Sequence, residues 1–335
     1  MKILLYAEGL KTIGKSGLGK AILHQMEALD YMGIDYTTDS KDDYDILHIN
    51  TYFPKSYFFA KKAKKYGKKI VYHAHSTEED YKDGFIFGRL TSKLFKKWLI
   101  KCYKLGDVII TPTEYSKRIL SGYEGLEDKK IFAISNGIDI DFFKSKKKDR
   151  DNFIKKYGYN ADDKIIVAIG LYIRRKGIVD FVELARRFPQ YKFIWFGYSN
   201  LMFSTNDVRK AFNSKPNNLT FAGYVEKEGI REALSSCDLY LFPTYEETEG
   251  IPMIEACAMK CNSIIRDIPI FDDFLVDGKH VYKAKDIDCF EEKIKMFFNG
   301  ELKPLADNCY DVALERDIKK VGERLSLVYE EVNKM

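Results

Sequence analysis

The chain has 335 residues, more than the ~100 to 200 residues of one ordinary domain, so two domains are expected. Hydrophobic residues make up 45% of the chain and charged residues 31%, which excludes a disordered or fibrous protein. The 6 cysteines are too sparse for a disulfide framework, and no uncharged apolar stretch reaches the ~18 residues of a membrane-spanning helix. Because the opening MKILLYAEGL lacks the cleavage site of a signal peptide, we expect a cytoplasmic protein with reduced thiols.

Short β-branched or aromatic runs alternate with amphipathic stretches, a pattern typical of parallel sheets covered by helices. The predicted strands of the first half are 2–7, 46–50, 69–73, 108–111 and 131–134. A lysine-rich stretch at 144–150 precedes a second series of strands at 165–169, 192–197, 219–221, 239–242 and 262–265. The sequence therefore predicts two doubly wound α/β halves, and two such sheets facing each other imply a ligand cleft at the carboxyl ends of their strands.

A glycine-rich turn, GKSGLGK at 14–20, follows the first predicted strand and opens the first helix. Glycines allow the backbone to approach a phosphate, and a helix N-terminus offers free N–H groups to it. The segment GLKTIGKS at 9–16 has the glycine, lysine and serine spacing of a P-loop, but we do not expect an ATPase. A ligand contact at Gly17 and a purely structural tight turn both stay open.

Two histidines stand at the end of the strand predicted at 69–73. His73 continues the alternation of Val71, so we expect it in the core. His75 follows the strand and is expected to face the ligand crevice. A metal site is not expected, because no further cysteine or acidic cluster has ligand spacing.

Positive charge is concentrated in one part of the chain. The formal net charge is +5, but residues 51–110 hold 14 Lys or Arg against 5 Asp or Glu, a local excess of +9. In this region a helical stripe of apolar residues is predicted, with lysines on its flanks and opposite face. The stripe is Leu90, Leu94, Phe95, Trp98, Leu99 and Cys102, and the lysines are Lys93, Lys96, Lys97, Lys101 and Lys104.

Two interpretations of this helix stay open. The stripe could face the core and leave a solvated lysine face, or the helix could rest on an anionic membrane, with Phe85, Ile86, Phe87 and Trp98 between the basic residues. Nucleic acid is not expected as a partner, because no helix-turn-helix, zinc-finger or RNP-type spacing accompanies the basic region.

The second half carries two motifs. Arg174, Arg175 and Lys176 precede Gly177 and a predicted helix, an arrangement suited to phosphate oxygens. Glu247 lies in the loop after the strand at 239–242, and Glu255 projects from the helix that Pro252 helps to begin. Two carboxylates at the carboxyl end of a strand can accept hydrogen bonds from sugar hydroxyls. Glu246 and Glu249 need no ligand to explain them, because acidic residues before a helix interact favourably with the helix dipole.

The order of these motifs resembles a known family. Glu247, seven intervening residues and Glu255, with Gly250 and Pro252 between them, resemble the donor-site signature of the retaining glycosyltransferases of family 4. Further segments similar to that family are Asn136-Gly137-Ile138-Asp139, Lys176-Gly177 and Gly223. Among its members, the bacterial enzymes that build glycosyl-diacylglycerol lipids are most similar in His75-Ser76-Thr77 and Arg266-Asp267-Ile268-Pro269.

The resemblance implies a GT-B fold, with a Rossmann-like acceptor and membrane-binding domain at 1–145, a nucleotide-sugar domain at 146–315, and a final helix at about 316–335 that returns to the first domain. It implies transfer of glucose or galactose from a UDP-sugar to a membrane glycolipid, most simply monoglucosyl-diacylglycerol, by a peripheral protein on the inner face of the cell membrane. No cofactor or metal ion is implied. Diacylglycerol itself and a soluble saccharide are the alternative acceptors.

The resemblance also assigns roles to residues. Arg175 and Lys176, with Arg174 next, stabilise the leaving diphosphate, while Glu247 and His75 act at the donor sugar. The remaining donor-site residues are Gly17, Gly223, Glu249, Gly250, Ile251 and Glu255, of which Glu255 is expected on the ribose. The membrane or acceptor surface is assigned to Lys93, Lys96, Lys97, Trp98 and Lys101. A nucleotide-sugar epimerase and a non-catalytic membrane-surface protein stay open as different classes.

Overall fold

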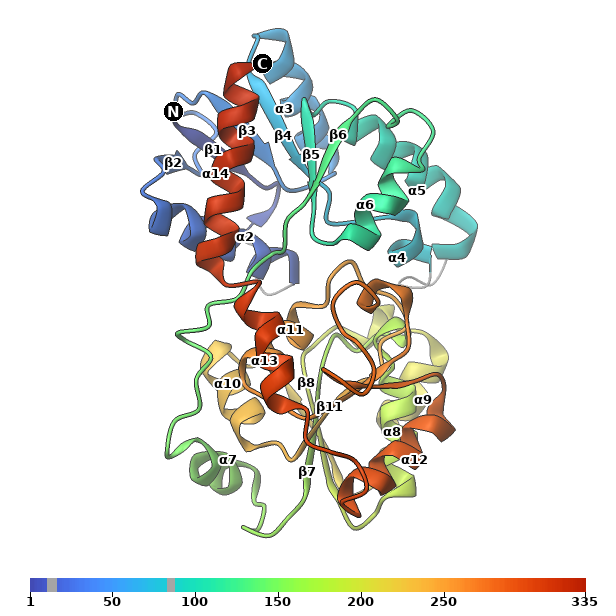
Figure 1. The fold of residues 1–335 in the computed structure, drawn as a ribbon. Helices are drawn as coiled ribbons and strands as arrows, with labels where there is room; N and C mark the ends of the chain where they lie inside the picture. Colours follow the sequence, from blue (N-terminus) through green and yellow to red (C-terminus); the bar gives the residue numbers. More distant parts are fainter. Residues whose placement is uncertain (11–16, 83–87) are drawn as a thin grey trace. The chain divides into compact units, whose positions relative to one another are not determined.

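The computed structural model describes residues 1–10, 17–82 and 88–335, and in it the chain divides into two compact units. The first unit takes in the described residues of 1–82 together with 89–139 and 316–335, and the second is built on 140–315. In Figure 1 each unit is a parallel sheet with helices on its faces. Each unit therefore has the doubly wound α/β architecture that the alternating pattern predicts.

The sheet of the first unit has the strand order β2-β1-β3-β4-β5-β6, and all neighbouring strands are parallel. Its strands are β1 (Ile3–Tyr6), β2 (Tyr36–Thr37), β3 (Ile46–Ile49), β4 (Lys69–His73), β5 (Val108–Thr111) and β6 (Lys130–Ala133). Its helices are α2 (Gly17–Met32), α3 (Pro54–Lys65), α4 (Glu78–Lys82), α5 (Gly88–Tyr103), α6 (Glu114–Ser121) and α14 (Ile318–Lys334).

Alternate residues of these strands face two cores. Val71 and Ile110 pack in the core that α2 and α14 cover, whereas Tyr72 and Ile109 pack in the core under α3 and α5. Helices α2 and α14 lie so close that a Cβ on Gly322 would stand 2.7 Å from the carbonyl oxygen of Ala28. The last helix is therefore part of the first unit's core.

The buried side of α14 differs in one position from the predicted one. The apolar spacing of the last 20 residues in the sequence predicts a buried side made of Val321, Leu325, Leu327, Val328 and Val332. Four of these five are buried, namely Val321, Leu325, Val328 and Val332. The prediction for Leu327 is wrong, because its side chain is 65% exposed. Residues 321, 325, 328 and 332 follow the spacing of one helical face, and position 327 falls outside it. Tyr329 is buried on this side instead.

The second unit has the strand order β12-β11-β10-β7-β8-β9, again with parallel neighbours. Its strands are β7 (Ile165–Ile169), β8 (Lys192–Phe196), β9 (Leu219–Gly223), β10 (Leu239–Phe242), β11 (Ser263–Arg266) and β12 (Tyr282–Ala284). Its helices are α7 (Asp149–Tyr157), α8 (Ile178–Arg187), α9 (Asn206–Asn213), α10 (Lys227–Ser236), α11 (Ile251–Ala258), α12 (Ile287–Phe298) and α13 (Ala306–Leu314). Short 3₁₀ turns are η1 (Arg174–Lys176), η2 (Leu201–Phe203) and η3 (Pro269–Phe271).

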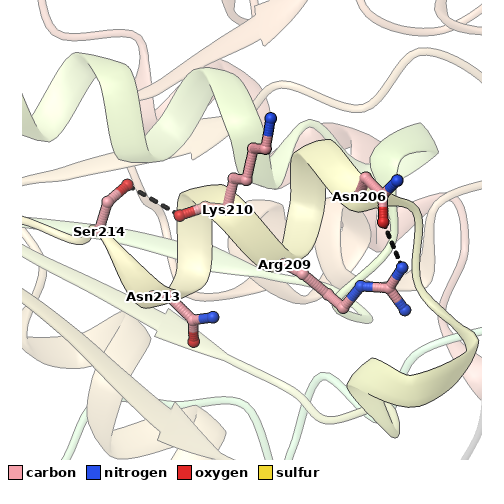
Figure 2. A pocket seen from close by; sticks show the side chains of 5 residues that line it. All are labelled: Asn206, Arg209, Lys210, Asn213 and Ser214. Atoms are coloured by element: carbon pink, nitrogen blue, oxygen red, sulfur yellow. Dashed lines mark hydrogen bonds between the residues drawn. The ribbon is translucent and has the colours of Figure 1, made fainter.

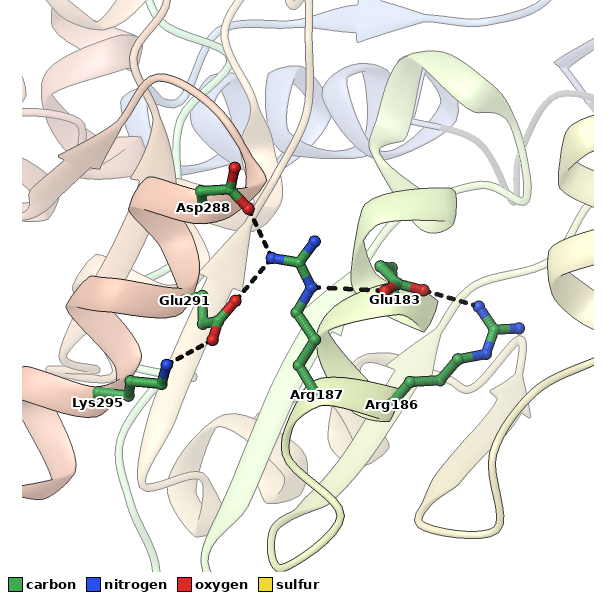
Figure 3. A network of polar contacts seen from close by, with 6 residues as sticks. All are labelled: Glu183, Arg186, Arg187, Asp288, Glu291 and Lys295. Carbon is green, nitrogen blue, oxygen red and sulfur yellow. Dashed lines mark hydrogen bonds and ion pairs between the residues drawn. The ribbon is translucent and has the colours of Figure 1, made fainter.

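Helices α8, α9 and α12 pack on one face of this sheet. Figure 3 shows an ion-pair network that joins α8 to α12 at the surface. Arg187 Nη1 lies 2.6 Å from Asp288 Oδ1 and 2.6 Å from Glu291 Oε2, and its Nε lies 3.4 Å from Glu183 Oε1. Because these groups are partly or largely exposed, each pair stabilises the unit by no more than ~1 kcal/mol.

Candidate functional site

The basic turn of the second unit is held against the end of a neighbouring strand. Gly177, between η1 and α8, has a φ of +78°, and a Cβ there would stand 2.2 Å from the carbonyl oxygen of Pro243, which follows β10. Only glycine fits this backbone and this spacing. The turn also accepts a hydrogen bond at the Arg175 carbonyl from the backbone N–H of Tyr245, 2.8 Å away. The basic turn and the acidic loop after β10 therefore meet.

Glu247 is the point at which these two segments meet. Its side chain is 8% exposed, and its Oε1 forms an ion pair with Lys176 Nζ. Arg175 Nη1 lies 3.9 Å from Glu247 Oε2, and the Thr244 hydroxyl donates to Oε1 over 3.2 Å. Arg175 also donates to the Glu246 carbonyl over 2.6 Å. Three of the predicted site residues, Arg175, Lys176 and Glu247, therefore form one charged cluster.

Arg174 lies outside this cluster. Its Nε is 3.4 Å from Asp207 Oδ2, and its side chain is 70% exposed. Arg175, by contrast, is largely buried beside Glu247. The structure thus separates two arginines that the sequence offered for the same phosphate contact.

The segment after Glu247 leads directly into α11. Gly250, with a φ of +84°, precedes Ile251, the first residue of the helix. Glu249 and Glu255 are both buried, with 2% and 1% exposure. Burial raises the pKa of Tyr240, and the negative charges of Glu255 and Glu247 near its hydroxyl add to the effect. Both predicted carboxylates therefore lie near the end of β10.

Two predicted glycines stand at ends of elements. Gly223 is the last residue of β9, and its carbonyl accepts a hydrogen bond from the Gly197 N–H over 2.8 Å. Gly17 is the first residue of α2. The part of the glycine-rich turn at 14–16 lies outside the described residues.

His73 and His75 stand at the carboxyl end of β4 in the first unit. Their rings are stacked, with centroids 4.0 Å apart, and His75 Nε2 lies 2.9 Å from Asn50 Oδ1. His73 is buried, as predicted, and His75 is half-buried. Burial lowers the pKa of His75 to about 3, so the ring is neutral at physiological pH.

The predicted stripe on α5 is divided between two faces. Leu99 and Cys102 are buried, but Leu90 and Leu94 are 84% and 69% exposed. The prediction of a single apolar stripe is therefore wrong, and the core-facing interpretation holds for Leu99 and Cys102 but not for Leu90 and Leu94. Positions 90, 94, 97 and 101 share one helical face by their spacing, and the core lies under a different face. The exposed side chains of this face are Leu90, Lys93, Leu94, Lys97, Lys101 and Lys104.

Two residues assigned to the membrane surface have partners within the first unit. Lys96 Nζ lies 3.5 Å from Glu78 Oε2 and 4.1 Å from the ring centroid of Tyr123. The Trp98 indole donates to the Tyr52 carbonyl over 2.6 Å and is half-buried. Phe85, Ile86 and Phe87 lie outside the described residues.

Sequence reasoning missed several polar residues that contact the predicted ones. Thr244 is one of them, since its hydroxyl donates to Glu247 Oε1 over 3.2 Å. In the first unit, Gln25, His48, Asn50 and Tyr329 contact each other or the two histidines. The signal for His48 and Asn50 is a polar residue at alternate positions of the otherwise apolar run ILHIN.

Other features lie apart from these residues. Figure 2 shows an open pocket on α9, lined by Asn206, Arg209, Lys210, Asn213 and Ser214, and none of these is a predicted site residue. Among the described residues, no three His, Cys, Asp or Glu side chains gather as a metal site would require. Within the same residues, none of the helices has both the length and the hydropathy needed to span a bilayer.

Two family models match the chain. The model described as "Glycosyl transferases group 1" matches residues 149–316, and the model "Glycosyltransferase Family 4" matches residues 36–142. The first match covers the charged cluster and α11, and the second covers His75 and the lysine face of α5.

The chain is also similar to individual proteins. It is 38% identical to the processive diacylglycerol alpha-glucosyltransferase of Acholeplasma laidlawii, over 100% of this chain and 99% of that one. It is 26% identical to the alpha-monoglucosyldiacylglycerol synthase of the same organism, over 77% of this chain and 68% of that one. Its fold matches the Anabaena HepE protein solved in complex with UDP-glucose, with a TM-score of 0.78, 16% identity, and coverage of 99% of this chain and 100% of that one. The fold match agrees with the GT-B architecture that the resemblance implies.

Proposed function

The chain belongs to glycosyltransferase family 4, and on this premise we propose that it transfers a hexose from a UDP-sugar to a glycosylated diacylglycerol. The observation that carries the proposal is the 38% identity, along the whole chain, to a processive diacylglycerol alpha-glucosyltransferase. Identity to a monoglucosyldiacylglycerol synthase is lower, at 26%. This lower identity favours monoglucosyl-diacylglycerol as the acceptor, and the glucosyltransferase name of the 38% identical relative favours glucose as the transferred sugar. Galactose transfer, first glucosylation of diacylglycerol and a saccharide acceptor are the alternatives.

The charged cluster supports a role for its cations in stabilising the nucleotide leaving group. As the glycosidic bond breaks, negative charge accumulates on the diphosphate, and cations already in place stabilise it without solvent reorganisation. Arg175 and Lys176 are such cations, because Glu247 holds both near one carboxylate. In this proposal Glu255 binds the ribose, and Glu247 exchanges part of its ion pairing for hydroxyls of the donor sugar.

No metal ion or cofactor is part of the proposal. The positive charge that a divalent ion would supply at the diphosphate is assigned to Arg175 and Lys176. Activity is therefore expected to persist at an unchanged rate after dialysis against EDTA. Loss of activity with EDTA and its return with Mg²⁺ or Mn²⁺ would contradict this assignment.

Retention at the anomeric carbon is proposed from the chemistry of donor and product. UDP-glucose carries its sugar in α linkage, and the 38% identical relative is named an alpha-glucosyltransferase. A donor and a product that are both α-linked require net retention. The ¹H NMR coupling constant of the new anomeric proton distinguishes an α-linked product from a β-linked one.

We also propose that the protein works as a peripheral protein on the inner face of the cell membrane. The lipid acceptor lies in a bilayer, and the exposed face of α5 carries Leu90 and Leu94 among lysines. Lysines are attracted to anionic headgroups, and leucines can enter the interface.

An activity screen tests the proposed function. UDP-glucose and UDP-galactose are each incubated with diacylglycerol and with monoglucosyl-diacylglycerol, and the products are identified by mass spectrometry. We expect UDP-glucose and monoglucosyl-diacylglycerol to give the fastest transfer. Consumption of UDP-sugar without an acceptor would favour an epimerase, and no turnover with any lipid would contradict the proposal.

A further inference from the structure

Arg266, the last residue of β11, is a buried cation to which the proposed function gives no role. Its side chain is 5% exposed, and its guanidinium forms an ion pair with Asp180, whose side chain is 17% exposed. Arg266 Nε donates to the Pro243 carbonyl over 3.0 Å, and Nη1 donates to the Lys285 carbonyl over 3.1 Å. The guanidinium carbon also lies 3.9 Å from the centroid of the Tyr245 ring. One arginine therefore joins the end of β11 to the loop after β10 and to α8.

Asp180 stands close to the basic turn. It lies in the first turn of α8, four residues after Lys176. The Tyr245 hydroxyl donates to Asp180 Oδ2 over 2.6 Å, and the backbone N–H of the same tyrosine donates to the Arg175 carbonyl over 2.8 Å. Burial raises the pKa of Tyr245 to about 12, and the hydrogen bond to Asp180 adds to the effect, so the hydroxyl keeps its proton at physiological pH. Tyr245 thus links the carboxylate to the segment that carries both cations of the charged cluster.

A carboxylate at this place opposes the binding of a phosphate. The charged cluster already contains one carboxylate, Glu247, beside its two cations. A second anion next to the basic turn lowers the attraction for a diphosphate unless a cation compensates it. Asp180 does interact favourably with the helix dipole, because it lies in the first turn of α8. That interaction stabilises the helix, but it does not remove the negative charge that a bound diphosphate would meet.

The contacts of Arg266 direct its charge to Asp180. Each of its three guanidinium nitrogens has a partner in the protein, and the Tyr245 ring lies against the guanidinium. Little of the side chain is exposed, so a bound anion would meet the charge of Arg266 only through space. The cation is therefore placed to compensate a neighbouring carboxylate and not to bind a phosphate itself.

We propose that Arg266 neutralises Asp180 and thereby keeps the basic turn attractive to the diphosphate of a nucleotide. Arg266 and Tyr245 are then positioning residues, because they hold and compensate Asp180 and do not touch the substrate. That the diphosphate belongs to a UDP-sugar rests on the proposed function, whereas the compensation of charge does not.

Three variants of the pair test the proposal, because the affinity for UDP should follow the charge at positions 180 and 266. Asp180→Asn keeps an acceptor for Tyr245 and leaves Arg266 uncompensated, so UDP should bind more tightly than to the wild type. Arg266→Met leaves the carboxylate uncompensated, and UDP affinity should fall by ~10-fold, the scale of one unit charge acting over ~10 Å near a protein surface. The double variant removes both charges and should restore UDP affinity to near the wild-type value. Isothermal titration measures all four proteins.

Uridine and inorganic pyrophosphate separate an effect of charge from an effect on structure. Uridine has no diphosphate, so its affinity, measured by ligand-observed NMR, should be equal in all four proteins. Pyrophosphate has no nucleoside and should follow the same order of affinity as UDP. Asp149→Asn is the matched control, since Asp149 forms another buried ion pair, 2.7 Å from Arg231, between α7 and α10, which contribute no predicted site residue. This variant should leave UDP affinity unchanged.

Several results would overturn the proposal. Weaker or unchanged UDP binding in Asp180→Asn would show that the carboxylate does not oppose the diphosphate. A double variant that binds UDP as weakly as Arg266→Met would mean that Arg266 contacts the phosphate or only supports the fold, and so would an equal loss of uridine affinity. Failure of the wild type to bind either UDP or pyrophosphate would also refute it. Should Arg266→Met not fold, Asp180→Asn still decides, because it keeps the bonds of Arg266 to both carbonyl groups.

Transferase activity separates this inference from the proposed function. A wild type without transferase activity toward any lipid, but with pyrophosphate affinities in the expected order, would refute the proposed function and leave the role of Arg266 intact. An active transferase whose UDP affinity is independent of the charges at positions 180 and 266 would do the reverse.

Discussion

Glu247 contacts both cations of the charged cluster in the second unit. Before any substrate binds, it forms an ion pair with Lys176 and lies 3.9 Å from Arg175. A largely buried charge needs such partners, because its desolvation is otherwise unfavourable. The same contacts keep both cations at fixed positions, which is the condition for stabilising a leaving group without reorganisation.

Lys176→Ala tests this role directly. We expect turnover to fall by ~100-fold or more, the scale for loss of one preorganised charge contact. Arg174→Ala is the matched control, since Arg174 is exposed and pairs with Asp207 outside the cluster, and its effect should be much smaller. Thermal melting verifies that both variants fold. Near-normal turnover in folded Lys176→Ala would remove Lys176 from the site.

The two buried carboxylates are expected to differ in what they bind. Glu255→Gln should weaken binding of free UDP as well as UDP-glucose, because its role is at the ribose. Glu247→Gln should spare UDP and lower the rate of transfer. Isothermal titration with UDP and steady-state kinetics measure the two effects. If UDP affinity fell equally in both variants, the division of roles would be wrong.

Among the elements, the longer strands were predictable and the two shortest strands were not. The predicted strands at 69–73, 108–111, 165–169 and 239–242 have the bounds found in the structure. The edge strands β2 and β12, of 2 and 3 residues, were missed because they contain no apolar run long enough to stand out. Local pattern is informative where a strand is buried on both faces.

The sequence pattern was less informative where packing against a distant part of the chain determines which side chains are buried. The apolar residues of α5 have helical spacing, but the sequence does not show which face another element covers, so Leu90 and Leu94 were misplaced. The contact between His48 and Tyr329 was missed for a related reason, because these residues are 281 positions apart in the chain. The acidic and basic segments of the second unit were found because each has a distinctive local sequence.

His48, which lies on β3 and contacts Tyr329 of α14, gives a prediction of how the free energy of unfolding depends on pH. Burial lowers the pKa of His48 to about 3 in the folded state, against ~6.5 in the unfolded chain. Between these values the unfolded state binds a proton that the folded state does not, so the free energy of unfolding falls as pH drops below ~6.5. One such histidine lowers the free energy of unfolding by at most ~1.4 kcal/mol for each pH unit below ~6.5. Above that pH it does not change the free energy of unfolding.

His48→Gln removes this titrating group and keeps a donor and an acceptor in its place. Urea unfolding at pH 7.5 and at pH 5.5 should show a smaller loss of stability in the variant than in the wild type. Carboxylates titrate in both proteins and cancel in the comparison. An identical loss of stability in the two proteins would show that His48 is not held neutral by burial.

For the molecule as a whole, the distribution of charge matters more than its total. The net charge is +5, while residues 51–110 alone carry an excess of +9. The structure places part of this excess on the outer face of α5 and part on α3, where Phe58 is 65% exposed beside lysines. The two helices are adjacent, because the Trp98 and Tyr57 rings have centroids 5.2 Å apart. Exposed apolar side chains within a basic surface are the two components of interfacial binding.

Vesicle sedimentation tests this surface. We expect binding to vesicles that contain phosphatidylglycerol at low salt and little binding to purely zwitterionic ones. Each basic residue near the surface adds ~1 kcal/mol, and the attraction fades as the Debye length shortens from ~10 Å at 0.1 M salt to ~3 Å at 1 M. Changing Lys93, Lys97 and Lys101 to Ser should abolish binding, whereas the Lys96→Ser change should matter less because Lys96 pairs with Glu78.

A control variant that loses the same number of lysines elsewhere distinguishes the effect of the α5 face from the effect of net charge. Lys146, Lys147 and Lys148 are exposed in the second unit, so their change to Ser removes the same charge from a different place and should leave vesicle binding intact. Leu90→Ser with Leu94→Ser should weaken binding even at low salt, because the apolar component is lost while the lysines remain. Equal binding to anionic and zwitterionic vesicles would instead mean that the lysine face is merely solvated, and the acceptor would then be sought among soluble saccharides.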